Sequence, residues 1–109
     1  MAETFVNKTV ALGDTVDTSV YSPAADTTAI VIHCQVAKVD GTDSADVNID
    51  LYDTSTTTAA AVVSTLSVPA NTAVNPVGGK LVLETSDELR VWASATGDLE
   101  LTLGILEIT

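Results

Sequence analysis

"LELTLGILEIT", residues 99–109, shows most directly how this chain folds. Apolar residues alternate with polar residues or glycine over 99–105, which is the period of a strand with one buried and one wet face. After Gly104 the apolar positions move to Leu106 and Ile108. A glycine at such a change of pattern predicts a β-bulge. We therefore expect the last strand to bend, or to change partners, near Gly104.

Three other segments show the same alternation, over residues 30–37, 46–51 and 89–94. In the first of them one side of the predicted strand is apolar and holds Ile30, Ile32, Cys34 and Val36. Segments with a weaker strand pattern cover residues 4–12, 16–21, 59–66 and 77–84. Stretches rich in turn-forming residues separate all of these segments, so about eight strands are expected.

No segment keeps the three-and-four spacing of an amphipathic helix over three turns. Short strands at roughly even spacing predict an all-β fold, a single β-sandwich of jelly-roll or immunoglobulin-like kind with about eight antiparallel strands. One domain, 1–109, accounts for the whole chain. Within it, residues 1–20 form either the first strand or an arm exchanged with a neighbouring subunit.

The charge balance excludes several kinds of partner. Fifteen acidic residues against four basic ones give a net charge of -11, which repels phosphate backbones and anionic lipid headgroups. We therefore expect no nucleic-acid partner and no membrane. The N-terminus lacks a signal-peptide pattern, and the longest apolar run, 59–63, is far too short to span a bilayer.

The apolar content suggests self-association. Hydrophobic residues make up 46% of the chain, which is more than one small core hides, so we expect a homo-oligomer. The chain has one cysteine and therefore no internal disulfide. The fold must rely on packing.

His33 and Cys34 raise the question of a nucleophile and its base. Neighbouring residues of a strand point to opposite faces, so the two side chains cannot form a dyad in regular β geometry. We interpret Cys34 as a buried hydrophobe and His33 as a surface or interface residue. Because motifs of hydrolases, metalloproteases and nucleotide-binding enzymes are also absent, we predict a protein that is not an enzyme and has no cofactor.

Acidic clusters are the remaining candidates for chemistry. Asp40, Asp43 and Asp46 surround Gly41 and offer oxygen ligands for calcium, although a solvated acidic hairpin explains them as well. The carboxylate pairs of a glycosidase are conceivable at Asp50 with Asp53, or at Asp87 with Glu88. In a chain this acidic such pairs arise by chance, so we expect no catalysis there.

Trp92 shares its side of a strand with polar residues, which favours a place in a subunit interface or in a second core layer, and it is our first interface candidate. The others are apolar residues near the two ends of the chain: Phe5, Val6, Leu106 and Ile108. The alternative for Trp92 is a sugar-binding platform, which requires Tyr21 and Tyr52 to be exposed beside it.

Two stretches resemble small virion proteins of tailed bacteriophages: "GGKLVLETSDELRVWASATGDLELTLGILEIT" at the C-terminus and "ADVNIDLYDTSTTT" in the middle. The resemblance covers the chain from about residue 45 onward and consists of strand and turn motifs. It implies a β-sandwich on the capsid surface of the virion, made in the host cytoplasm. The implied role is a decoration or cement protein, trimeric, that binds the major capsid protein and bridges capsomers. A tail or neck component, or a carbohydrate-binding or host-binding module, is the alternative.

Overall fold

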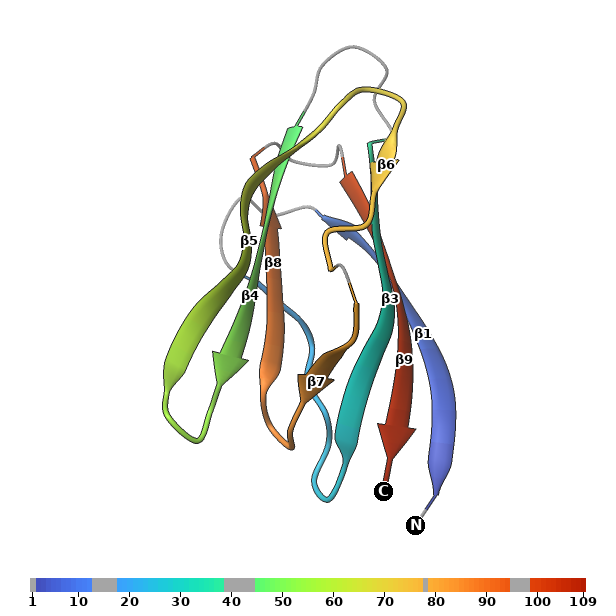
Figure 1. Cartoon of the computed structure of the whole chain (residues 1–109), viewed down its shortest axis with the longest axis vertical. Helices are drawn as coiled ribbons and strands as arrows, with labels where there is room; N and C mark the ends of the chain where they lie inside the picture. Colours follow the sequence, from blue (N-terminus) through green and yellow to red (C-terminus); the bar gives the residue numbers. More distant parts are fainter. Residues whose placement is uncertain (1, 13–17, 39–44, 78, 95–98) are drawn as a thin grey trace.

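Two antiparallel sheets face each other in the computed structural model of the chain (Figure 1). The structure describes residues 2–12, 18–38, 45–77, 79–94 and 99–109. Sheet A contains β1 (Glu3–Leu12), β9 (Leu99–Ile108), β3 (Thr28–Lys38), β6 (Ala73–Val74) and β7 (Leu81–Leu83). Sheet B contains β2 (Thr18–Tyr21), β8 (Glu88–Ala93), β4 (Ala45–Asp53) and β5 (Thr58–Val68). The predicted all-β single sandwich is confirmed.

The strand order distinguishes the two kinds of sandwich that the sequence leaves open. Sheet A runs β1-β9-β3-β6, with β7 also paired to β3, and sheet B runs β2-β8-β4-β5. When β6 and β7 are counted as one interrupted strand, this is the order of an eight-stranded jelly roll. Consecutive strands alternate between the two sheets except at β4 and β5, which pair within sheet B. The molecule is elongated, with extents of 47 × 27 × 21 Å.

The core lies between the sheets and comes from the alternation seen in the sequence. On β9 the fully buried residues are Leu99, Leu101, Leu103 and Ile105, each at most 1% exposed. From sheet B, Val47, Ile49, Leu89 and Val91 meet them. Residues that are paired in neighbouring strands direct their side chains to the same face, so the inner face of each sheet is continuous.

A bulge in β3 departs from the sequence prediction. Val31 pairs with Ile105 and His33 pairs with Gly104, so Ile32 is an extra residue on β3. The irregularity expected at Gly104 therefore belongs to the opposite strand, and β9 keeps a continuous register with β1. The extra residue also reverses the expected side of the first half of β3: Ala29 and Val31 are buried, while Ile30 and Ile32 lie outside.

The strand expected over 77–84 is shorter than predicted. Only Leu81–Leu83 forms β7, and β6 lies earlier, at Ala73–Val74. Pro76 lies between them, and it has no backbone N–H to donate to a ladder. Both short strands pair with β3 and together form one edge of sheet A.

Candidate assembly surfaces

A row of apolar side chains crosses the outer face of sheet A. Phe5 of β1 is the register partner of Leu106 of β9. Leu106 also pairs with Ile30 of β3, which in turn pairs with Val82 of β7. Partners directly opposite each other have Cβ atoms roughly 5 Å apart on one face. The row therefore runs from one edge of the sheet to the other.

Two more apolar residues extend this row. Ile108 lies two residues along β9 from Leu106 and hence on the same face. A Cβ added to Gly104 would lie 3.2 Å from the Cβ of His33 and 3.8 Å from Cγ1 of Ile32, so the bulge turns both residues to the outer face. We call the set the apolar patch, and it comprises Phe5, Ile30, Ile32, Val82, Leu106 and Ile108.

The apolar patch contains the exposed large hydrophobic residues of the described chain. Phe5 is 74% exposed, Val82 53% and Ile32 42%, and each lies on the outer face of sheet A. Single exposed apolar residues are ordinary, but a contiguous set usually marks a contact surface. The gathering of all three on one face therefore makes this face a candidate contact surface.

The face around the apolar patch is almost free of charge. Glu3 and Glu100 lie at opposite ends of the face, and the outward positions between them on β1, β9 and β3 hold no Asp, Glu, Lys or Arg. β4 is the only strand that contains aspartate. In a chain of net charge -11, this face offers a neighbour the least electrostatic repulsion.

β1 forms a long open edge beside the apolar patch. Ala2 and Thr109 exchange two backbone hydrogen bonds of 3.0 and 2.8 Å, and the register from there to Leu12 has no shift. Because such bonded pairs alternate along an antiparallel ladder, every second residue directs its N–H and C=O away from β9. We call these backbone groups the open edge, and they belong to Glu3, Phe5, Asn7, Thr9 and Ala11.

The other sheet edges are short or irregular. β2 has four residues, β6 two and β7 three. β5 has 11 residues, but its register with β4 shifts twice, between Val47 and Ile49 and again between Ile49 and Asp50. Thr65 of β5 has a left-handed φ of 55°, and its N–H donates to Oδ1 of Asn48 at 2.8 Å. Bulges of this kind bend an edge and prevent further pairing.

The outer face of sheet B is polar, and its side chains contact one another. The Arg90 guanidinium lies 4.0 Å from the centroid of the Tyr52 ring, and its Nε is 2.9 Å from Oε1 of Glu88. Trp92, a half-buried residue, is the partner of Asn48 on this face. Tyr21 instead reaches Glu107 between the sheets, where it donates a hydrogen bond to Oε2. The three aromatic residues of the sugar-binding alternative are thus not assembled into a platform.

The predicted interface residues are divided among three locations. Phe5, Leu106 and Ile108 lie together in the apolar patch. Val6 is on the inner face and packs against the core, and Trp92 is on the opposite sheet. Ile30, Ile32 and Val82 were not predicted, because their positions depend on the bulge in β3 and on the pairing of β7.

His33 and Cys34 lie on opposite faces of β3. Cys34 is 2% exposed in the core, and burial raises the pKa of its thiol to about 11. His33 is exposed on the outer face. A nucleophile needs a base within hydrogen-bonding distance and a thiolate near neutral pH, and this pair provides neither.

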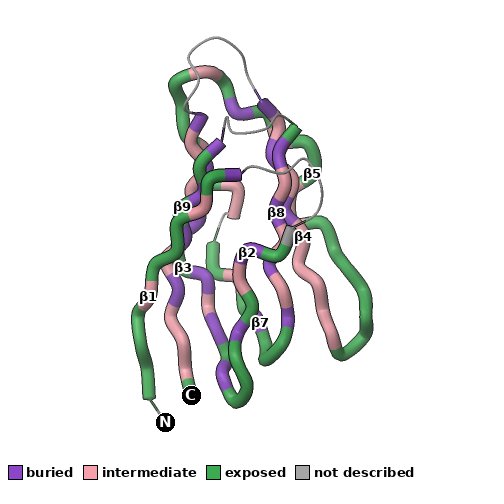
Figure 2. Tube along the Cα trace, turned by 180° about the vertical axis from the view of Figure 1, so that it is seen from behind, coloured by how far each residue is buried: buried purple, intermediate pink, exposed green. Residues whose placement is uncertain are grey.

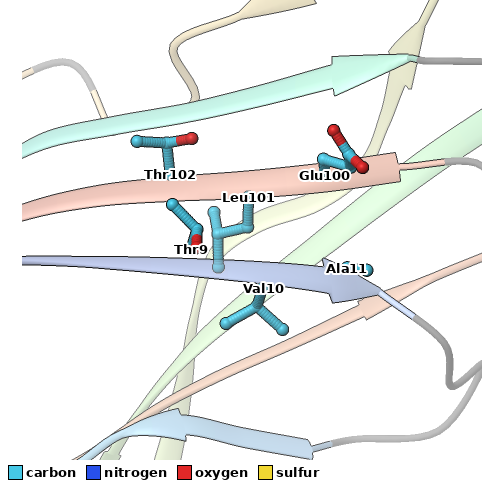
Figure 3. A pocket seen from close by; sticks show the side chains of 6 residues that line it. All are labelled: Thr9, Val10, Ala11, Glu100, Leu101 and Thr102. Carbon is cyan, nitrogen blue, oxygen red and sulfur yellow. The ribbon is translucent and has the colours of Figure 1, made fainter.

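Two hollows lined by described residues are open and lack convergent ionisable groups. One hollow of about 310 Å³ lies over the end of the β1–β9 pair, with Thr9, Glu100 and Thr102 at its rim (Figure 3). Another, of about 370 Å³, lies between the bulge of β3 and the β6–β7 connection and includes His33, Asn75 and Lys80. Neither hollow brings together the paired groups that acid–base catalysis requires.

The carboxylates of Asp53 and Asp87 have hydrogen-bond partners within the chain. Asp87 is 4% exposed and accepts hydrogen bonds from the N–H groups of Thr54 and Glu84. Asp53 accepts from Ser55, which lowers the pKa of the Asp53 carboxyl. Asp40 and Asp43 lie outside the described residues, and Asp46 is the second residue of β4. The described part of the chain contains no group of three or more potential metal ligands.

No protein-family model and no curated protein sequence matches the chain. Among solved structures it is similar to a protein of the Bacillus endospore appendages, which form a family of disulfide-linked pili. The TM-score is 0.53 and the identity 17%, over 100% of this chain and 91% of that chain. It is also similar to VP2 of infectious bursal disease virus, with a TM-score of 0.43, 13% identity, and coverage of 97% of this chain and 32% of that chain.

At this level of identity, the likeness to the appendage protein shows a shared sandwich fold. It does not test the resemblance to tailed-phage proteins, which stays a prediction.

In the described residues, no helix has the length and apolar character needed to cross a membrane.

Proposed function

We propose that the chain is a non-enzymatic structural subunit of a tailed-phage particle, a decoration or cement protein on the outside of the capsid. The observation that carries the proposal is the apolar patch, a contiguous apolar surface on an almost uncharged face of an otherwise acidic molecule. Jelly rolls are common in viral capsids, and the sequence resemblance points to the same class of protein. Copies of the chain and the major capsid protein are the proposed partners.

The energetics of such a contact are favourable. Complete burial of an exposed Phe, Val or Ile side chain contributes about 1.5–3 kcal/mol. Several such side chains in one patch offset part of the free-energy cost of the lost rotational and translational freedom. Contacts around the patch must supply the remainder. The acidic remainder of the surface repels free copies and favours solubility.

Adhesion in this protein is proposed to be non-covalent. The similar appendage protein belongs to disulfide-linked pili, but this chain has a single cysteine. Cys34 is buried, and burial raises the pKa of its thiol to about 11, so little of the reactive thiolate forms near neutral pH. Contact area, and not a disulfide, must hold the subunit in place.

Shell binding tests the proposal. Shells assembled from the proposed partner, the major capsid protein, are sedimented with the purified chain. We expect co-sedimentation, and we expect the double variant Phe5→Ser, Val82→Ser to bind at least tenfold more weakly because it removes the most exposed apolar side chains. Trp92→Ala on the opposite sheet is the matched control.

Two outcomes count against the proposal. Equal binding by the double variant would mean that the apolar patch is not the contact. Binding to tail tubes and not to shells would favour the tail or neck alternative. The resemblance implies a trimer, and light scattering distinguishes a trimer from other oligomeric states.

A further inference from the structure

The open edge of β1 is an unused hydrogen-bonding surface, with five residues that direct N–H and C=O groups away from β9. We propose that it pairs with β1 of a second copy of this chain, antiparallel and about a twofold axis, so that two copies of sheet A become one continuous sheet. Addition of a strand to an exposed sheet edge is a common mode of protein association.

The regularity of β1 favours it over every other edge of the described chain. Its ten residues keep an unbroken register with β9, contain no proline, and are exposed or half-buried up to Leu12 (Figure 2). A second strand therefore meets an uninterrupted row of donors and acceptors in the alternating spacing of an antiparallel ladder. β5, the other long edge, is bent by two register shifts.

One register uses the whole open edge. With Asn7 opposite Asn7 of the second copy, Glu3 pairs with Ala11 and Phe5 with Thr9. Each residue of the open edge then pairs with a residue of the other open edge. This arrangement forms about ten hydrogen bonds between the two strands. A shift of this register by two residues in either direction leaves one open-edge residue of each copy without a partner.

The charges of β1 permit this pairing with a second copy. The strand contains one acidic residue, Glu3, and one basic residue, Lys8. In the proposed register Glu3 lies opposite Ala11, and Lys8 lies opposite Val6. Like charges directly opposite each other destabilise paired strands. The proposed register contains no such pair. Two copies of net charge -11 can therefore meet at a strand without net charge.

The twofold axis is perpendicular to the joined sheet, so both apolar patches lie on the same side. The paired molecule then presents one extended apolar surface, and binding at one half makes binding at the other intramolecular. This consequence for capsid binding depends on the proposed function. The pairing of β1 strands does not.

Proline at a position of the open edge tests the pairing. Asn7→Pro removes an N–H that does not bond to β9, and proline is tolerated on an edge strand in this position. We expect wild-type protein to have the mass of two copies by light scattering, and Asn7→Pro to have the mass of one. Asn7→Ala keeps the N–H and should remain paired. Circular dichroism establishes that both variants keep the wild-type β signal.

A cross-link provides a second measurement that does not require proline. In the proposed register the Cα atoms of the two Asn7 residues are about 5.5 Å apart, within the range of a disulfide. Asn7→Cys should form a covalent dimer under mild oxidation, seen on a non-reducing gel. Val82→Cys lies at the far edge of sheet A and should not.

These outcomes separate the inference from the proposed function. Wild-type protein that is monomeric or trimeric, folded Asn7→Pro that remains paired, or Asn7→Cys that does not cross-link would each overturn the β1 pair. Shell binding by a monomer would do so while supporting the proposed function. A β1 pair with no affinity for shells would overturn the proposed function alone.

Discussion

The two sheets share one core but have opposite outer faces. On sheet B the outward side chains of β4 and β8 contact one another, as Arg90 does with Tyr52 and Glu88. On sheet A the outward side chains of β1, β3, β7 and β9 form the bare apolar patch. The outward side chains of β4 and β8 have partners within the chain, whereas the described part of sheet A keeps Phe5, Ile32 and Val82 exposed. The comparison indicates which side of a small sandwich is available for assembly.

The inner faces should respond alike to truncation, and this is the largest expected effect. Leu103→Ala on sheet A and Ile49→Ala on sheet B each remove a side chain that is 0% exposed. We expect each to lower the free energy of unfolding by about 2–5 kcal/mol, measured by urea denaturation. A small loss on one sheet alone would mean that the two sheets do not share a single close-packed core.

The hydrogen bond between Tyr21 and Glu107 joins the two sheets. Tyr21→Phe should lower the free energy of unfolding by about 1 kcal/mol, because the Glu107 carboxylate loses its donor from β2. Burial, with the hydrogen bond and charge of Glu107, raises the pKa of Tyr21.

This raised pKa has a defined effect on stability. Above pH ~10 the unfolded chain loses the phenolic proton while the folded chain keeps it, so the stabilisation is complete below that pH and is lost as pH rises through the raised pKa. Denaturation between pH 8 and 11 should show the difference between wild type and Tyr21→Phe shrinking at the alkaline end. A difference that grows with pH would contradict this assignment.

Gly104 controls the shape of the apolar patch. In Gly104→Ala the added methyl group would lie 3.2 Å from the Cβ of His33, which is closer than ordinary van der Waals contact. We expect thermal denaturation to show a loss of about 1 kcal/mol as the bulge shifts. Thr102→Ala, on the same face of β9, is the control and should have a smaller effect. The opposite ranking would mean that the bulge tolerates a side chain at Gly104.

The smallest effects should distinguish the two outer faces. Phe5→Ser is expected to change the free energy of unfolding by less than about 0.5 kcal/mol, because a largely exposed side chain contributes little to folding. Tyr52→Ala removes the ring beneath Arg90 and should cost about 0.5–1 kcal/mol. Parallel urea titrations compare the two. A larger loss for Phe5→Ser would show that the apolar patch serves the fold and not a neighbour.

The predicted strands agree well with the structure where one face is polar. Over β4 the alternation of Val47, Ile49 and Leu51 with polar residues identifies the inner face correctly. Over β3 both faces are largely apolar, so the pattern does not fix the orientation of the strand, and the predicted side of Ile30 and Ile32 is wrong. Gly104 marked the irregularity but could not show which of the two strands has the extra residue.

The apolar patch was only partly predictable, for a topological reason. Phe5 and Leu106 are nearly a full chain length apart, and their contact depends on the pairing of the first strand with the last. Local patterns carry no information about such pairing. The surplus of apolar residues predicted a contact surface, and the register of sheet A shows where the exposed apolar side chains gather.

The hydrogen bonds between Ala2 and Thr109 place the two ends of the chain side by side (Figure 1). A short linker between these residues would make the backbone cyclic, and a new opening at the exposed Ser55–Thr57 turn would yield a circular permutant with the same two sheets. A peptide fused at either end would emerge beside Ile108. The fold is therefore a compact scaffold for displaying two different cargoes from a single point.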